Sequence, residues 1–104
     1  MTSYRKYRAV PTEVDGIKFP SKKEAARWQQ LKLLERAGQI SQLTRQVPYD
    51  LFVNGKKVCR YVSDFNYYEG DQLVVEDSKG MPTPAYRIKK KLMDAVYNIQ
   101  IRET

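Results

Sequence analysis

The expected fold follows from one stretch of the chain, residues 63–80, which reads SDFNYYEGDQLVVEDSKG. Gly70-Asp71 is a turn signal between two runs that are rich in aromatic and β-branched residues, which predicts a β-hairpin. Symmetric antiparallel pairing about this turn places Tyr68 opposite Leu73, and Asp64 opposite Asp77. Directly opposed residues on one sheet face have β-carbons about 5 Å apart. The stretch therefore predicts two carboxylates side by side.

Lys79 follows Asp77 by two residues and, because side chains alternate along a strand, is expected on the same face. Two facing aspartates repel each other, so the pair requires a cation or a proton. Magnesium is bound by carboxylate oxygens, water and substrate phosphate, and it lowers the pKa of its bound water. The spacing thus predicts a phosphodiester hydrolysis site in which Lys79 handles the attacking water. Glu76 has the opposite parity and is not assigned to it.

The same spacing is compatible with two arrangements that involve no catalysis. Lys79 and a neighbouring aspartate fit a solvated surface ion pair. A bulge of one residue would move Asp64 out of register with Asp77.

A helix is expected upstream of this hairpin, over residues 22–37. Ser21 and Glu24 have the spacing of a capping box, and Gly38 is placed to end the helix. Its expected apolar stripe consists of Trp28, Leu31 and Leu34. Glu24 lies on the same inward face, so it is either a helix-capping residue or an additional acid of the site.

The other elements follow from turn signals. Asp15-Gly16 predicts a short hairpin over 14–19, and Asn54-Gly55 predicts a turn before a return strand over 57–68. A third strand is expected from Leu73 to Gly80, and an alternating segment at 98–101 is expected as the last strand.

A second helix is expected after Thr83, a natural N-cap followed by Pro84 at the first helical position. Its expected apolar positions are Ala85, Ile88, Leu92 and Val96. The predicted class is therefore α/β with a mixed sheet: a short hairpin, then helix, three strands, helix and strand.

Composition restricts the chemistry. A chain of 104 residues is about one domain, so we expect a basic arm at 1–9 and a single domain at 10–104. The net charge of +7 favours polyanionic partners such as nucleic acid. Without histidine, and with Cys59 as the single cysteine, the chain cannot build a Ser-His-Asp triad or a thiolate metal cluster. Any metal site is expected to use oxygen ligands.

We expect no membrane association and a cytoplasmic location. No apolar run approaches the roughly 20 residues that a membrane-spanning helix requires. The N-terminal segment MTSYRKYRAV lacks the apolar region of a secretory signal.

Together, these residues resemble the motif of the PD-(D/E)XK nuclease superfamily. Asp64 matches the first acid of that motif, and Asp77-x-Lys79 matches the second acid and the lysine. The expected element order from Ser21 to Ile101 is similar to the restriction-endonuclease-like core of the superfamily. Two departures are Ser63 in place of the nominal proline and Asp77 in place of a glutamate, and both are compatible with the motif.

Two longer segments are similar to small phage and prophage proteins of that superfamily, which are related to Holliday-junction resolvases. They are KYRAVPTEVDGIKFPSKKEAARW at 6–28 and TPAYRIKKKL at 83–92. The resemblance implies a DNA endonuclease that depends on magnesium (Mg2+), with Mn2+ as a substitute. It further implies branched DNA as substrate, a role in phage recombination or replication, a bacterial or phage-infected host cell, and a homodimer.

The resemblance also implies the roles of individual residues. Asp64 and Asp77 are the implied metal ligands, helped by the Ser78 carbonyl, and Glu24 is a ligand or a water-mediated support. Lys79 is the implied catalytic lysine. The expected DNA contacts are Arg5, Lys6, Arg8, Lys22, Lys23, Tyr86, Arg87, Lys89, Lys90 and Lys91. Packing in the core accounts for Tyr86 equally well.

Two other functions fit the same composition. One is a basic nucleic-acid-binding module without catalysis, in which the carboxylates are structural. The other is a subunit of a larger phage DNA-processing complex. Cleavage that depends on a divalent metal distinguishes the nuclease from the simple binding module.

Overall fold

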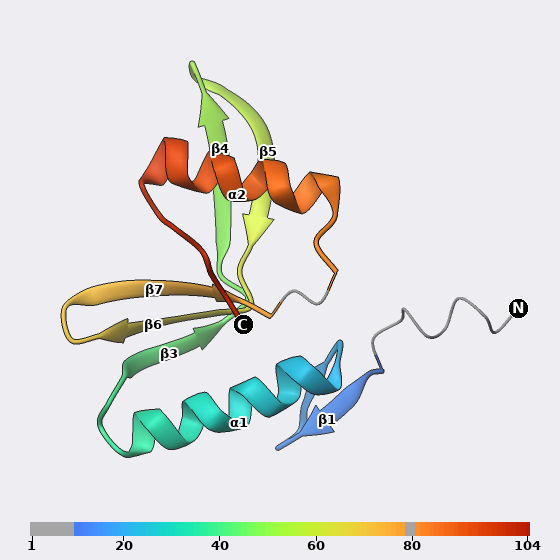
Figure 1. The fold of residues 1–104 in the computed structure, drawn as a ribbon, viewed down its shortest axis with the longest axis vertical. Coiled ribbons are helices and arrows are strands. Elements are labelled where there is room, and N and C mark those ends of the chain that lie inside the picture. Colours follow the sequence, from blue (N-terminus) through green and yellow to red (C-terminus); the bar gives the residue numbers. More distant parts are fainter. Residues whose placement is uncertain (1–9, 79–80) are drawn as a thin grey trace, which may run out of the picture.

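The computed structural model describes residues 10–78 and 81–104 (Figure 1). Three predicted DNA contacts, Arg5, Lys6 and Arg8, lie outside the described residues, together with the rest of the expected arm. The predicted catalytic lysine, Lys79, also lies outside them.

The N-terminal hairpin and the first helix are confirmed. Strands β1 (Thr12–Val14) and β2 (Ile17–Phe19) pair antiparallel across Asp15-Gly16. Both turn residues have positive φ, 52° and 77°, as a two-residue hairpin turn requires. Helix α1 (Lys22–Arg36) begins after Ser21, whose Oγ accepts a hydrogen bond of 3.1 Å from the amide of Glu24. The expected stripe faces inward: Leu31 and Trp28 are buried, and Leu34 packs against them.

The predicted return strand over 57–68 is wrong, because the chain forms two strands there. Between the helices lie β3 (Ser41–Arg45), β4 (Pro48–Val53), β5 (Lys56–Val62), β6 (Phe65–Glu69) and β7 (Gln72–Asp77). Strand β5 ends where Ser63 donates its N–H to the Val47 carbonyl at 3.0 Å. The Ser63 hydroxyl also donates to Asn66 Oδ1 at 2.6 Å, and both residues are buried. These bonds stabilise a bend that the apolar pattern does not contain.

The bent strands divide the molecule into two packed halves (Figure 1). One half has the four-stranded sheet β3-β6-β7-β8, in which β8 is Arg102–Glu103, covered by α1. The other has the two-stranded ribbon β4-β5, crossed by α2 (Pro84–Tyr97). Because β7 and β8 are parallel whereas the other pairs are antiparallel, the predicted α/β class with a mixed sheet is confirmed.

The predicted register of the β6-β7 hairpin is confirmed over β6, whereas Asp64 precedes β6 and is not paired with Asp77 in the ladder. Tyr68 faces Leu73, and the pairing continues to Phe65 opposite Glu76. Val74 belongs to the α1 core cluster and Val75 to the α2 core cluster, as expected for alternating side chains. Two consecutive acids, Glu76 and Asp77, therefore point to opposite sides of the sheet.

The predicted last strand at 98–101 is wrong, because β8 is Arg102–Glu103. Asn98 instead ends α2 in the left-handed conformation, with φ 56° and its N–H bonded to the Asp94 carbonyl. Ile99 and Ile101 then pack into the α2 core. Their apolar alternation reflects this packing and not strand pairing.

The predicted inward face of α2 is wrong at three of its four positions: Leu92 packs against the core, but Ala85, Ile88 and Val96 are exposed. The buried residues of the helix are Tyr86 and Met93, whereas Ile88 is 59% exposed. A two-stranded ribbon is narrow, so a helix lying across it buries only a thin stripe. Residues seven apart, two helical turns, form that stripe.

Glu76 joins several parts of the chain. It is fully buried and accepts hydrogen bonds from Arg27 Nε at 2.6 Å and Nη2 at 2.9 Å. The Tyr67 hydroxyl and the Thr104 hydroxyl also donate to this carboxylate. The bond with Glu76 raises the pKa of Arg27. One carboxylate thus connects α1, β6, β7 and the residue after β8.

We expect Arg27→Ala to lower the free energy of unfolding by about 3 to 5 kcal/mol, because it leaves the buried Glu76 carboxylate without its cation. Urea denaturation followed by circular dichroism measures this change. Arg36→Ala is the matched control, since Arg36 is exposed on the same helix, and it should cost less than about 0.5 kcal/mol. Equal costs for the two variants would contradict the assigned role of Glu76.

Candidate active site

The structure brings Asp64 and Asp77 together at one end of the β6-β7 hairpin. Asp77 is the last residue of β7, and Asp64 immediately precedes β6. The Asp64 amide donates to the Glu76 carbonyl at 3.1 Å, and the Ser78 amide donates to Asp64 Oδ2 at 2.7 Å. The side chain of Asp64 is therefore bound to the backbone that follows Asp77.

Tyr61 of β5 contacts this pair from the α2 side. Its side chain is buried, and its hydroxyl donates to Asp77 Oδ2 at 2.7 Å. Burial raises the pKa of the Tyr61 phenol well above its usual range, and the hydrogen bond to Asp77 and the charges of Asp77 and Asp64 raise it further. The negative charges of Asp77 and Asp64 thus disfavour ionisation of the Tyr61 phenol, which remains a neutral hydrogen-bond donor.

Tyr86 reaches the same place from α2. Burial is the main cause that raises its pKa, followed by its bond of 2.8 Å to Glu103 and by the charge of Asp77. Its ring lies 6.4 Å from the Tyr61 ring, centroid to centroid. Tyr86 is therefore a core residue that also lines the site, so core packing and a place in the site are compatible for this residue.

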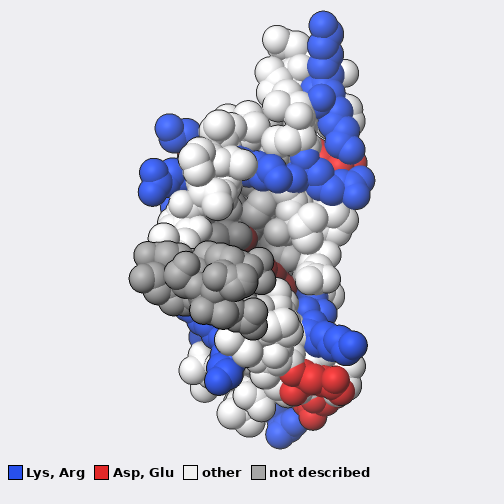
Figure 2. Space-filling view, turned by 90° about the vertical axis from the view of Figure 1, so that its right-hand side faces the viewer, with Lys and Arg blue, Asp and Glu red and all other residues white. Residues whose placement is uncertain are grey.

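A pocket of about 260 Å³ opens beside Asp77, between β5 and the first turns of α2. The lining residues that bear on its chemistry are Arg60, Tyr61, Asp77, Thr83, Tyr86 and Lys89. Figure 2 shows Lys and Arg side chains above and below a recess in which acidic surface is visible. The pocket combines a buried carboxylate with two cations and two aromatic rings.

Glu24 lies in the first turn of α1. It is buried, and its Oε2 lies 3.8 Å from Arg45 Nη2. The Arg45 guanidinium in turn lies over the Phe19 ring at 4.4 Å. Within the described residues, no group of three or more acidic, histidine or cysteine side chains is placed to hold a metal ion. A metal-binding role for Glu24 stays a prediction. The nearby Arg45 guanidinium compensates the negative charge of the buried Glu24 carboxylate.

Ser78 has contacts that the sequence pattern does not predict. Its amide binds Asp64, and its hydroxyl lies 3.1 Å from the Thr104 hydroxyl. The predicted role of its carbonyl as a metal ligand stays a prediction.

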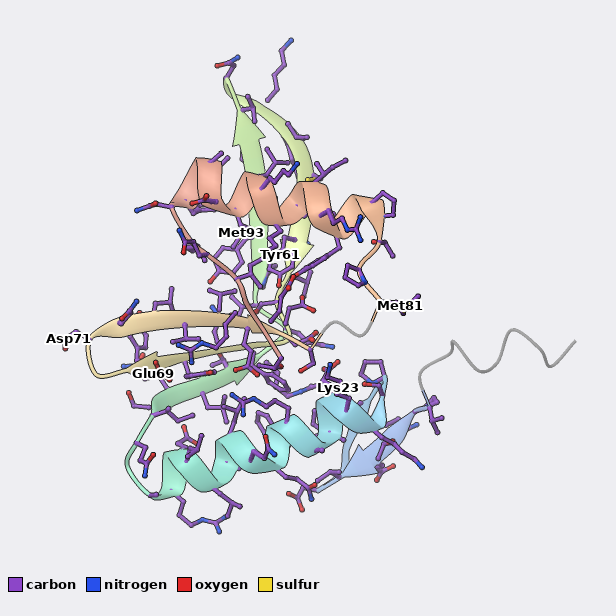
Figure 3. The ribbon with its side chains drawn as sticks, viewed as in Figure 1. Lys23, Tyr61, Glu69, Asp71, Met81 and Met93 are labelled. Atoms are coloured by element: carbon purple, nitrogen blue, oxygen red, sulfur yellow. The ribbon has the colours of Figure 1, made fainter. Side chains whose placement is uncertain are left out.

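The predicted DNA-binding residues fall into separate groups. Lys22 and Lys23 lie in the first turn of α1, and Lys23 lines a small pocket with Ser78 on the α1 side (Figure 3). Three residues of α2, Arg87, Lys90 and Lys91, line a larger groove of about 620 Å³ that also includes Asp94 and Glu103. Lys89, on the same helix, lines the Asp77 pocket instead.

Two residues of the site were missed by sequence reasoning. Tyr61 and Arg60 have the pattern of ordinary strand residues, and β5 and β7 do not pair with each other. Only the bend after β5 brings Tyr61 to Asp77. No motif or spacing in the sequence singles out either residue.

A family model described as "Protein of unknown function (DUF1064)" matches residues 4–104. The chain belongs to this family. Comparisons with curated proteins and with solved structures found no match. Neither of the described helices is long and apolar enough to cross a membrane.

We expect the Tyr61→Phe variant of this DUF1064 protein to be less stable than the parent below pH 10, by about 1 to 3 kcal/mol, because Asp77 loses a donated hydrogen bond. Above pH 10 this difference in free energy of unfolding between the parent and the variant should become smaller. The phenol ionises near pH 10 in the unfolded chain but stays neutral in the folded one, so the parent loses stability as the pH rises.

Urea unfolding of both proteins between about pH 8 and about pH 11 tests this expectation. The narrowing is limited to about 1.4 kcal/mol per pH unit. A gap that stays constant across this range would show that the Tyr61 phenol is not held neutral in the folded protein.

Proposed function

We propose that this chain is a Mg2+-dependent DNA endonuclease of the PD-(D/E)XK type. One observation carries the proposal. The Asp64 carboxylate binds the amide of Ser78, directly after Asp77, and the charges of both acids act on the Tyr61 phenol, while Asp77 lines a pocket with Arg60 and Lys89. Acids placed together next to cations fit a metal and a phosphate group better than they fit an inert core.

The donor set fits a hard divalent cation. Magnesium is usually bound through one or two carboxylates, with water and substrate phosphate completing its coordination. Asp64 and Asp77 supply such oxygens, and Ser78 and Glu24 remain candidate supports. When bound, the ion would lower the pKa of a water and offset negative charge on the phosphoryl group. Manganese, with similar oxygen ligands, is the expected substitute.

The surrounding residues have distinct proposed roles. Tyr61 holds the Asp77 carboxylate in one orientation through its hydroxyl. Lys79, two residues after Asp77 in the sequence, is proposed to orient or deprotonate the attacking water. Arg87, Lys90 and Lys91 on α2, with Lys22 and Lys23 on α1, bind the phosphate backbone of DNA without reading its sequence.

Three parts of the proposal come from the resemblance to phage resolvase-like nucleases. They are a preference for branched or structured DNA, a role in phage recombination or replication, and a homodimer. Resolvases cut two opposed strands, which suits a twofold dimer. We also propose the cytoplasm of a bacterial or phage-infected cell as the place of action.

A second candidate is a DNA-binding module without catalysis, alone or within a larger phage complex. The observation that favours it is the hydrogen bond from Tyr61 to Asp77, because it gives this acid a structural role. Such a module would bind DNA whether or not a divalent metal is present.

We expect Asp77→Asn to slow the nicking of supercoiled DNA in Mg2+ by about 100-fold or more, because it removes a charged metal ligand. DNA binding, measured by fluorescence anisotropy in EDTA, should change little because the basic surface is kept. Supercoiled plasmid should also stay intact when EDTA is added to the parent protein.

Asp71→Asn is the matched control, since Asp71 lies in the turn at the far end of the same hairpin (Figure 3). It should cut like the parent. Equal cleavage by Asp77→Asn and the parent would exclude Asp77 from the catalytic site. Binding without any cleavage by the parent would favour the non-catalytic module.

A further inference from the structure

The Asp77 pocket has cationic residues on two different elements. Arg60 comes from β5 and Lys89 from α2, and both line the pocket together with Asp77. Arg60 was not among the residues expected to contact DNA. Arg60 and Lys89 thus place two positive charges in the pocket beside Asp77, where they can bind an anion.

Arg60 has hydrogen-bonding capacity left for a ligand. Its Nε donates to Asp50 Oδ1 at 2.8 Å, and this bond raises the pKa of Arg60. The other N–H groups of the guanidinium make no hydrogen bond to a described residue. Lys57 lies 3.3 Å from the same Asp50 oxygen, so two cations share one acid and the cluster keeps a positive charge.

Lys89 is the second cation. It forms no ion pair with any residue that the structure describes. Lys90, its neighbour, differs because its Nζ lies 3.1 Å from Glu103 Oε2. The larger groove on α2 therefore has cations partly neutralised by acids, whereas the Asp77 pocket has Lys89 available for an anion.

The rest of the pocket suits one unit of a DNA strand. The tilted rings of Tyr61 and Tyr86 give it an apolar wall next to the cations. Its volume of about 260 Å³ lies just below the range of about 300 to 1,000 Å³ that is usual for pockets binding drug-sized ligands. A sugar with its phosphate fits such a space, and a duplex does not.

We infer that Arg60 and Lys89 form a subsite that holds the phosphate of a single nucleotide unit beside Asp77. The inference rests on the proposed function in taking a DNA strand as the ligand. It adds that one unpaired nucleotide next to the cleaved bond enters the pocket, with its phosphate between β5 and α2.

The test is a binding titration without metal, so that it does not depend on cleavage. Deoxythymidine 5′-monophosphate is added to the full chain in EDTA and followed by amide chemical shifts in NMR spectra. Inorganic phosphate and deoxythymidine are tested alongside it. We expect the nucleotide to shift amides around the pocket, the nucleoside not to, and phosphate to bind more weakly because it lacks the ring contacts.

Arg60→Ala and Lys89→Ala should each weaken nucleotide binding by about tenfold, since each removes a charge-assisted hydrogen bond. Lys57→Ala is the control for Arg60, because Lys57 shares Asp50 but does not line the pocket. Ile88→Ala is the control for Lys89 on the same helix, because Ile88 is exposed and does not line the pocket. Both controls should stay within about twofold of the parent. Urea denaturation verifies that each variant is folded.

The outcomes separate the subsite from the nuclease. Loss of binding in both pocket variants but not in the controls supports the inference, even for a protein that does not cut DNA. Shifts confined to the Lys91 groove, or equal binding by all four variants, overturn it. Cleavage by the parent together with either of these results would leave the nuclease proposal in place and remove only the subsite.

Discussion

The buried carboxylate of Glu76 is the interaction on which the arrangement of the site depends. Arg27 on α1 neutralises it, and Tyr67 and Thr104 bind its oxygens, so the end of β7 is held against α1. Because side chains alternate along a strand, fixing Glu76 on the α1 side places Asp77 on the α2 side. Glu76, which has no role in the proposed chemistry, therefore determines the side of the sheet to which Asp77 points.

The sequence was sufficient where a local signal determined the structure. The turn at Gly70-Asp71 fixed the β6-β7 register, and the Ser21 cap fixed the start of α1. The register led us to expect Asp64 near Asp77, and the bonds of Asp64 to Glu76 and Ser78 hold it at the end of β7. These features depend on residues close together in the chain, so the local sequence pattern was enough to predict them.

Features that depend on distant contacts were missed. The bend after β5 rests on Ser63 bonding to Val47 and Asn66, and apolar periodicity carries no information on such polar bonds. The inward face of α2 was misplaced because two sets of positions in that helix have helical spacing. Only the narrowness of the β4-β5 ribbon selects Tyr86 and Met93. The same bend places Tyr61 and Arg60 at the site. Because a single strand was predicted over 57–68, these two residues were not expected there.

The two core clusters have a consequence for how the protein opens. One cluster packs under α1, the other between α2 and the ribbon, and adjacent residues of β7 belong to different clusters. Each is small enough to be a separate cooperative unit in hydrogen exchange. An opening confined to α2 and the ribbon would separate Tyr86 and Tyr61 from Asp77 while β6 and β7 stay paired, so the walls of the Asp77 pocket depend on the stability of one half of the molecule.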